Sequence, residues 1–436
     1  MSGSPAESSQ CGFPRRGDAQ RCASVVAMLA RALSFVLLVV GLSACGSSSE
    51  NPDADAGAVG VDAGADAAVA GADFVFDESQ IRIYKLTLPS TTWDQLNQSA
   101  RDELYVSAQL EFEGETIENI GLRFKGGYGS LFFCFNGDQR VCDKLSIKLK
   151  FNEYVPGQRL HGLKRINLHS MNADPSKMHD AIGYKLFRDQ GVYAPRMAYA
   201  RIEVNGESLG LYAAIEAIDG RFTRARFPDG GEGNLYKEVW PEHSSEAPYI
   251  NALKTNEDTN PSADKMVRFA AAITAAGDAG FAEMMRSWTD VDMLMRYMAV
   301  DRLIDHWDGI VAWYCNGGGC NNHNFYWYES TVEDRVWLVP WDLDHTFEEP
   351  SPIRTNFGMP DWDAAVSDCT PITIFFGITG RPPSCDPLID RIARIFWTEY
   401  VAATNTLLDG AFSQQAMSDR IDQLAALIEA EVDADT

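Results

Sequence analysis

Two neighbouring stretches of the sequence, DHWDGIVAWYCNGGGCNNHNFYWYE at residues 305–329 and PWDLDHTF at residues 340–347, place carboxylates, amides and a glycine loop within a short length of chain. Carboxylate and amide oxygens that converge usually bind a hard metal ion or move a proton. Either stretch alone is more simply explained as a turn or a loop. Their combination in this order favours a site.

The polar side chains of these stretches stand at the ends of predicted elements. A segment with helical spacing ends shortly before Asp308, and Asn324 precedes an aromatic strand. The next strand leads into Asp342 and Asp344. The order is therefore an Asp, an Asn one loop later and an Asp pair after the following hairpin, and together these groups favour one site.

The charge of the chain limits what it binds. The 436 residues include 62 acidic and 37 basic side chains, which gives a formal net charge of −25. Nucleic acid binding needs a basic face that displaces counterions, so this balance excludes nucleic acid as the main partner. A hydrophobic content of 45% is enough for one large domain or two ordinary ones.

We expect residues 1–45 to be a targeting segment and residues 46–72, rich in Ala, Asp and Gly, to be a flexible tether. The uncharged apolar run at 32–40 is too short to span a bilayer, which takes about 20 residues. Leu-Ser-Ala-Cys at 42–45 resembles the lipobox of a bacterial lipoprotein. That resemblance implies cleavage before Cys45, lipid on its sulfur and a place in the cell envelope. The Gly that follows favours the outer membrane.

Six cysteines follow the tether as three near pairs. An even number of cysteines in an exported chain favours disulfides over free thiols. Zinc binding is the alternative, but no pair has the two-residue spacing of a zinc knuckle and no histidines cluster beside them. We expect three local disulfides, within Cys134/Cys142, Cys315/Cys320 and Cys369/Cys385.

The rest of the chain, residues 73–436, changes from strand-like to helical patterning about halfway along. This pattern predicts an α+β fold with a strand-rich N-lobe at about 73–215 and a helix-rich C-lobe at about 216–436. Asn205-Gly206 predicts a hairpin turn, and Asp174-Pro175 predicts the start of a helix that ends at Gly191. Further strands are expected at 81–88, 118–124 and 145–151, and further helices at 91–99, 262–278, 290–305 and 386–432.

A basic strand forms a second feature. Lys144, Ser146, Lys148 and Lys150 share one strand face because alternate residues point the same way. Upstream, three glycines at 126–129 follow a strand, where backbone N–H groups can approach an anion. A structural turn and a solvated strand face are the plainer explanations. Together the two features predict a site for a phosphate-rich ligand.

Many landmarks of the chain, in order, resemble those of the spore-coat CotH kinase-like family, whose members look like distant, minimal protein kinases. The resemblance implies a two-lobe kinase-like fold with ATP between the lobes. It also implies Mg²⁺ or a similar ion, such as Mn²⁺ or Ca²⁺, and phosphorylation of Ser or Thr in exported proteins. The landmarks are LRFKG at 122–126, KLSIKLKF at 144–151, VNGESLGLY at 204–212, IEAID at 215–219, NLYK at 234–237, HWD at 306–308, HNFY at 323–326 and PWDLDHTF at 340–347.

The resemblance implies a role for several polar residues of this sequence. Asp308 matches the catalytic base, and Asn324 and Asp342 match the metal ligands, with Asp344 as a second candidate. Lys148 matches the strand lysine that contacts nucleotide phosphates. The other expected nucleotide-binding residues are Arg123, Lys144, Glu216, which lies where the adenine would rest, and Lys237 just beyond it.

The spacing of the base and its amide departs from the kinase pattern. Asp308 and Asn324 are sixteen residues apart, whereas a kinase catalytic loop separates the two by about five. A bridge between Cys315 and Cys320 would pinch off the insertion as a hairpin, so that the two side chains still meet. Without it, Asp305 or Asn322 would serve instead.

Two further departures concern the basic strands. Lys125 stands where family members often have an arginine, which matters if a bidentate contact is required. The helix after the basic strand has no glutamate to pair with Lys148. Asp180, with a shorter side chain, is the nearest acidic candidate.

The leading interpretation is a membrane-tethered exported kinase that binds ATP and a protein substrate. The alternative is a catalytically silent, kinase-like protein that binds partners in the envelope or at a spore surface. A metal-dependent hydrolase or a Ca²⁺-binding module on the same carboxylates is a third. The first predicts that Asp308 and Asp342 are essential for phosphate transfer, the second that they are dispensable for partner binding, and the third that they bind metal without nucleotide.

Overall fold

The computed structural model describes residues 71–127, 131, 133–259, 261–317, 319–348, 359–375 and 378–435, all within one unit that spans residues 54–436. The expected signal segment with its lipidation site Cys45, most of the expected tether and residues 128–130 of the glycine stretch lie outside the described residues. Of the helices in the described part, none is both long and apolar enough to cross a membrane.

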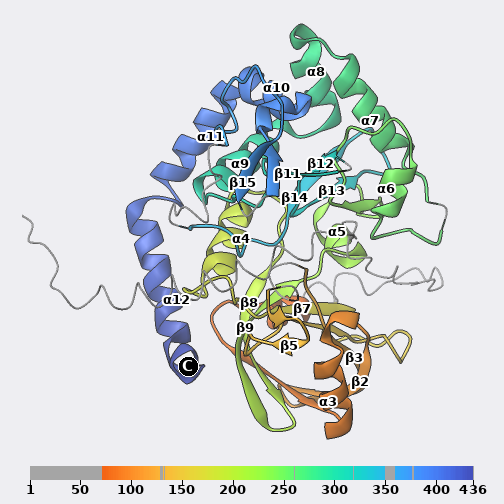
Figure 1. Ribbon diagram of the computed structural model, residues 1–436, viewed down its shortest axis with the longest axis vertical. Coiled ribbons are helices and arrows are strands. Elements are labelled where there is room, and N and C mark those ends of the chain that lie inside the picture. Colours follow the sequence, from red (N-terminus) through yellow and green to blue (C-terminus); the bar gives the residue numbers. More distant parts are fainter. Residues whose placement is uncertain are drawn as a thin grey trace, which may run out of the picture. The chain divides into compact units, whose positions relative to one another are not determined.

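The strand-rich part of the chain forms a closed barrel in the order β1-β2-β3-β6-β7-β9-β8, in the lower part of Figure 1. Neighbouring strands pair antiparallel, except that β1 and β8 run parallel and close the ring. Apolar side chains at alternate positions, such as Ile147 and Leu149, form its core. The barrel strands are β1 Arg82–Thr87, β2 Val106–Phe112, β3 Glu115–Phe124, β6 Ile147–Lys150, β7 Arg165–His169, β8 Met197–Val204 and β9 Glu207–Glu216.

The mixed α+β composition is confirmed, but the closed barrel was not predicted. Alternation of apolar residues looks the same in an open sheet and in a barrel. Closure depends on pairing between distant segments, such as Arg82 of β1 opposite Ala200 of β8. The two-lobe kinase-like arrangement stays a prediction.

Two local turn signals had different outcomes. The predicted hairpin joins β8 and β9, with positive φ angles at Asn205 (52°) and Gly206 (87°), as a tight hairpin turn requires. The predicted helix start at Asp174 was wrong. Asp174 instead accepts hydrogen bonds from the backbone N–H groups of Ser176 and His179, both at 2.8 Å, and the helix begins only at His179.

Figure 1 labels helices α3 to α12, which lie within the described residues. The long helical stretch expected at 386–432 is divided into three helices, because Phe396 and the segment from Gly410 to Ser413 end one helix and begin the next. The bounds are α3 Ser90–Gln98, α4 His179–Asp189, α5 Gly220–Arg226, α6 Ala247–Asn251, α7 Asp264–Ala275, α8 Asp278–Trp288, α9 Val291–Leu303, α10 Pro387–Ile395, α11 Trp397–Asp409 and α12 Gln414–Ala434.

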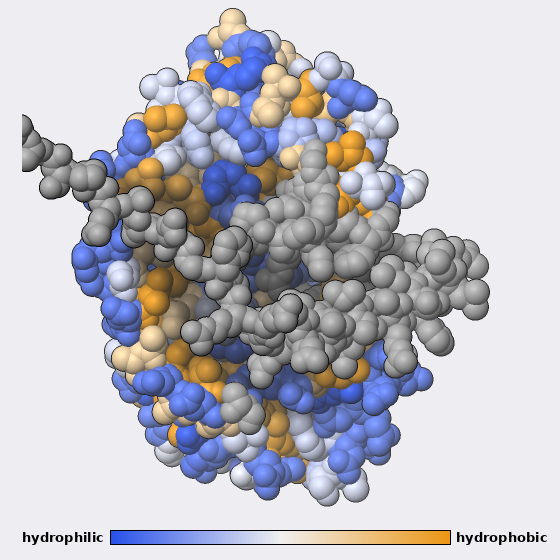
Figure 2. Space-filling view, turned by 60° about the vertical axis from the view of Figure 1, so that its left-hand side comes forward, coloured by the Kyte–Doolittle hydropathy of each residue, from blue (hydrophilic) through white to orange (hydrophobic). Residues whose placement is uncertain are grey.

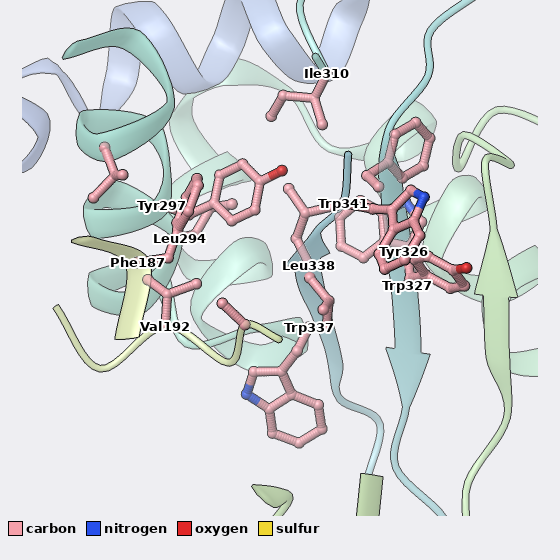
Figure 3. Packing of buried hydrophobic residues seen from close by; sticks show 14 of the residues in the cluster. Phe187, Val192, Leu294, Tyr297, Ile310, Tyr326, Trp327, Trp337, Leu338 and Trp341 are labelled. Carbon is pink, nitrogen blue, oxygen red and sulfur yellow. The ribbon is translucent and has the colours of Figure 1, made fainter. Parts of the chain in front are cut away.

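A second hydrophobic core lies among these helices and two small sheets. Figure 3 shows how it packs: Phe187 of α4 and Leu294 and Tyr297 of α9 lie on one side, and Trp337 and Leu338 of β14 lie on the other. One sheet has the order β10-β13-β14 and the other β12-β11-β16-β15. Their strands are β10 Leu235–Lys237, β13 Phe325–Glu329, β14 Val336–Pro340, β11 Trp313–Asn316, β12 Gly319–Asn321, β15 Ile372–Phe375 and β16 Ile378–Arg381.

The three expected disulfides are present. Cys134–Cys142 encloses the short hairpin of β4 Phe135–Asn136 and β5 Gln139–Arg140. Cys315–Cys320 links β11 to β12, and Cys369–Cys385 spans the β15–β16 hairpin. In Figure 2, hydrophilic side chains prevail over the described surface at the bottom, where the barrel lies, as expected for strands with apolar residues inside.

The C-terminal helix α12 reaches back to the barrel. Arg201 of β8 pairs with Glu431 at 3.2 Å. Asp435, just beyond α12, pairs with Lys144 and accepts a hydrogen bond from the backbone N–H of Leu211 at 3.3 Å. A side chain at Gly210 would collide with the carboxylate of Asp435. The end of the chain therefore connects the two cores.

Glu329, the last residue of β13, makes the stability of this second core depend on pH. Burial raises the pKa of its carboxyl from 4.5 to about 7, and Oε1 accepts a hydrogen bond from Asn234 at 2.9 Å. Between these two pH values the folded chain holds a proton that the unfolded chain has lost, so stability falls as pH rises. We expect wild type to lose about 3 kcal/mol relative to Glu329→Gln between pH 4.5 and 7.5.

Urea unfolding of both proteins across this range measures that difference, because other titrating groups cancel in the comparison. A difference that stays constant with pH would contradict the prediction.

Candidate functional site

Asp308 and Asn324 meet despite the sixteen residues between them. The Asn324 side-chain amide donates to Asp308 Oδ2 at 2.9 Å and to the Asp308 backbone carbonyl at 3.0 Å. This is the contact that the sequence predicted for an insertion pinched off as a hairpin. The base and the amide of the predicted site are therefore together.

The insertion closes at three levels. At its base, the buried Asn322 side chain donates to the carbonyl of Ile310 at 2.7 Å. Further out, β11 pairs with β12, and Cys315 and Cys320 form both a register pair and a disulfide. Asn322 is therefore used to close the insertion. Asp305, the other alternative, lies exposed after α9 with a φ of 49°.

Asn324 and Asp342 lie beside each other at one end of the β13–β14 hairpin. Phe325 is opposite Pro340 in the register, and the Trp341 backbone N–H donates to the carbonyl of Asn324 at 3.1 Å. Both Asn324 and Asp342 have positive φ angles, 63° and 51°. Non-glycine residues in that conformation cluster at functional sites, where surrounding structure holds them in place.

His306 ties these segments together, and sequence reasoning assigned it no role. Its ring is fully buried, with Nδ1 3.0 Å from Asp301 Oδ1 and Nε2 3.2 Å from the Asp342 carbonyl oxygen. Both partners are hydrogen-bond acceptors, and through these two contacts the ring links Asp342 to the end of α9. Gly309 leaves room for it, since a Cβ there would lie 2.6 Å from Nδ1. The signal in the sequence was a histidine between two aspartates in the segment that follows α9.

Asp344 lies in a concentration of negative charge. Burial raises its pKa well above the ordinary range, and the nearby carboxylates of Asp342, Asp180 and Asp308 raise it further. Asp342 is accessible, with 35% of its side chain exposed. Asp180 is buried, and its Oδ1 has no hydrogen-bond partner in the described part of the chain. Carboxylates that raise one another's pKa in this way favour positive charge nearby.

A basic face of the barrel lies next to this acidic group. The strand registers place Arg123, Lys148 and Asn167 side by side on β3, β6 and β7. At the end of β7, His169 Nδ1 is 3.7 Å from Asp180 Oδ2 and 3.8 Å from Asp342 Oδ1. Basic and acidic side chains from separate parts of the fold therefore meet here, as a phosphate bound with a metal ion requires.

The predicted basic residues differ in what they contact. Lys148 is 5% exposed on the basic face. Lys125 Nζ is 3.0 Å from His169 Nε2 and lies over the Trp341 ring at 5.8 Å from its centre. Arg123 already pairs with Glu103 at 2.7 Å, so its charge is balanced within the barrel. The phosphate-binding role of Lys148 stays a prediction.

Lys144 and Glu216 are occupied elsewhere. Lys144 donates to the Leu211 carbonyl at 2.8 Å and pairs with Asp435. Glu216 has no exposed surface, and its carboxylate binds Arg196, Arg221 and Arg226. Its side chain is therefore not accessible to an adenine base.

Lys237 is connected to the site through its neighbour. Its Nζ is 3.8 Å from Glu238 Oε1, which also accepts a hydrogen bond from the Asn324 backbone N–H at 3.3 Å. Burial opposes ionisation of Glu238, but Lys237, His323 and the Asn324 N–H lower its pKa to about 2. Glu238 thus helps to hold Asn324 in place, although it was not among the predicted site residues.

The oxygen-bearing side chains here suit a magnesium ion that is bound partly by the protein and partly by phosphate oxygens. Within the described ranges, no three His, Cys, Asp or Glu side chains form a metal site by themselves. The predicted ligands are instead the Asn324 amide and the Asp342 and Asp344 carboxylates. Mg²⁺ typically takes one or two carboxylates and completes its shell with water and substrate phosphates. The residues present fit that pattern.

The part of the chain that contains this site is similar in sequence to known proteins. A sequence model of the family described as CotH kinase protein matches residues 122–436. Over 283 residues the chain is 22% identical to the inner spore coat protein H of Bacillus subtilis (strain 168), covering 62% of this chain and 70% of that protein. The family match begins within β3 and includes all the site residues described above, from Arg123 to Asp344.

Proposed function

The chain belongs to the CotH kinase protein family, and on that premise we propose that it is an ATP-dependent protein kinase. In this proposal it is exported, tethered to the cell envelope through lipid on Cys45, and transfers the γ-phosphate to Ser or Thr hydroxyls of other exported proteins. The observation that carries the proposal is the bond between Asn324 and Asp308 Oδ2. It joins base and metal ligand across an insertion that a kinase catalytic loop lacks.

Each group has a chemical task in this proposal. Asp308 accepts the proton of the substrate hydroxyl as that oxygen attacks phosphorus. Asn324 and Asp342, with Asp344 next to them, would hold Mg²⁺ or Mn²⁺, which supplies positive charge to the phosphate oxygens when bound. Lys148 contacts the phosphates from the barrel side.

Removal of the metal and substitution of Lys148 together test the proposal. We expect label from the ATP γ-phosphate to appear on protein with Mg²⁺, to disappear with EDTA and to return when Mg²⁺ is restored. Lys148→Met should raise the KM for ATP by about ten- to hundredfold, because a phosphate contact in a water-poor site is lost.

Lys185→Met, which removes a half-buried lysine paired with Asp189 on α4, is the matched control and should keep the wild-type KM. Equal labelling by wild type and Lys148→Met at low ATP would contradict the assignment. Absence of both labelling and ATP binding would contradict the kinase proposal itself.

Similarity to a spore coat protein supports a second candidate function, a catalytically silent binding protein of the envelope or spore surface. In that case Asp342→Asn should leave assembly with the partner intact. Co-purification of partners with wild type and with the variant would distinguish the two functions.

A further inference from the structure

The proposed function leaves one contact of the catalytic base unused. The Tyr314 hydroxyl donates to Asp308 Oδ1 at 2.6 Å. Tyr314 is half-buried on β11, inside the insertion, and its ring lies 5.6 Å from that of His323. A side chain from inside the insertion therefore contacts Asp308, which lies just before the insertion begins.

The two oxygens of Asp308 are held by different elements. Oδ1 binds Tyr314 of β11, and Oδ2 binds Asn324 at the start of β13. A carboxylate has about four lone-pair sites, so two such bonds fix its rotation and still leave acceptor capacity for a substrate hydroxyl. The arrangement resembles what any general base needs, namely a partner that sets its orientation before the substrate arrives.

Tyr314 is itself held by the disulfide next to it. It lies opposite Asn321, and the adjacent register pair is the bridged Cys315 and Cys320. Thr379 of β16 donates to the Cys315 carbonyl at 3.0 Å. β16 pairs with the other edge of β11, with Tyr314 opposite Gly380. Among the described strands β12 is an edge strand that pairs with β11 alone, and the disulfide links this edge covalently to the strand of Tyr314.

The first residue of β11 anchors this strand in the core. Trp313 is 1% exposed, packs edge-on against Trp240 with ring centres 5.7 Å apart, and lies under the Arg381 guanidinium at 4.1 Å. One end of β11 is thus anchored in the core, and the disulfide secures the other. Tyr314 lies between the two.

We propose that Tyr314 is a positioning residue for Asp308 and that the Cys315–Cys320 disulfide keeps it in place, so that phosphoryl transfer depends on the redox state of this one bond. The inference rests on the proposed function, since it concerns the base of that reaction. A dithiol reductant breaks the Sγ–Sγ bond to give two cysteine thiols and is itself oxidised to a disulfide. The Tyr314 hydroxyl then loses its fixed distance to Asp308 Oδ1.

Tyr314→Phe is the first test. It keeps the ring and removes the hydroxyl, so kcat should fall by about ten- to hundredfold, as for a lost hydrogen bond to a charged group, while the Kd for ATP stays unchanged. Tyr328→Phe is the matched control, because its hydroxyl also contacts a carboxylate, Asp229 at 2.9 Å, away from Asp308. That control should keep the wild-type kcat.

The second test asks whether the disulfide acts through the tyrosine. Cys315→Ala/Cys320→Ala should lower kcat in the wild-type background and have no further effect when combined with Tyr314→Phe. Additive losses would overturn the link between the two. An unchanged kcat in Tyr314→Phe would overturn the positioning role, and so would an increase, which would mean that the hydroxyl competes with the substrate.

A readout that does not need activity separates this inference from the proposed function. With ¹³C-labelled aspartate, the Asp308 carboxyl signal, assigned by its loss in Asp308→Asn, should shift in Tyr314→Phe and on reduction, but not in Tyr328→Phe. A shift without phosphate transfer in wild type would reject the kinase proposal and retain the contact. Phosphate transfer by wild type without a shift of the signal in Tyr314→Phe would retain the kinase proposal and reject the role of the contact.

Discussion

Asp308→Asn should lower kcat for phosphoryl transfer by about a hundred- to ten-thousandfold, with the Kd for ATP within about twofold of wild type. Asparagine has the same shape but cannot accept the substrate proton. Single-turnover transfer to a protein substrate measures kcat, and calorimetric titration measures nucleotide binding.

Asp305→Asn is the matched control, because this exposed aspartate lies three residues earlier. If Asp305→Asn lost activity and Asp308→Asn kept it, the base would be Asp305. The contact between Asp308 and Asn324 would then be structural only.

Glu216→Gln should destabilise the fold by about 3–5 kcal/mol, because it leaves buried arginines without their counter-charge. Glu216 ends β9, the last barrel strand, and binds Arg196 at 2.7 Å, Arg221 at 2.9 Å and Arg226. Burial opposes ionisation, but the arginines hold its pKa far below the ordinary range. Its contribution is therefore present above the unfolded pKa and is lost as pH falls below it.

Urea unfolding at pH 7 measures this loss. Glu111→Gln removes a pair of the same length, 2.7 Å to Lys85, but both partners are about half exposed. That control should cost far less stability than Glu216→Gln, because solvent screens the pair. Similar losses in both variants would mean that burial does not control the strength of the Glu216 network.

Local signals predicted local structure well. The Asn205-Gly206 hairpin and the three disulfides follow from turn chemistry and cysteine spacing, which act over a few residues. The helix start at Asp174 failed for a related reason. An aspartate side chain binds free backbone N–H groups in a turn as readily as at a helix end, and here the turn precedes the helix.

Features that join distant segments were not predictable. Closure of the barrel needs β1 to pair with β8, and the alternation of apolar residues in a strand does not show which strand is its partner. Glu216 and Lys144 looked like ligand contacts on the strength of their positions, but a sequence does not show that three arginines or Asp435 already bind them. Asp308 and Asn324 could be paired in advance only because two cysteines marked where the chain between them doubles back.

The contacts of Asp435 bear on where an affinity tag can be placed. Asp435 binds Lys144 and the Leu211 N–H against Gly210 of the barrel, so an affinity tag fused directly after residue 436 would crowd that contact. A tag inserted in the exposed turn at 258–259 would avoid it. Preparations tagged in the two places should differ in melting temperature, and the comparison would show whether inactivity of a recombinant sample comes from the protein itself or from its tag.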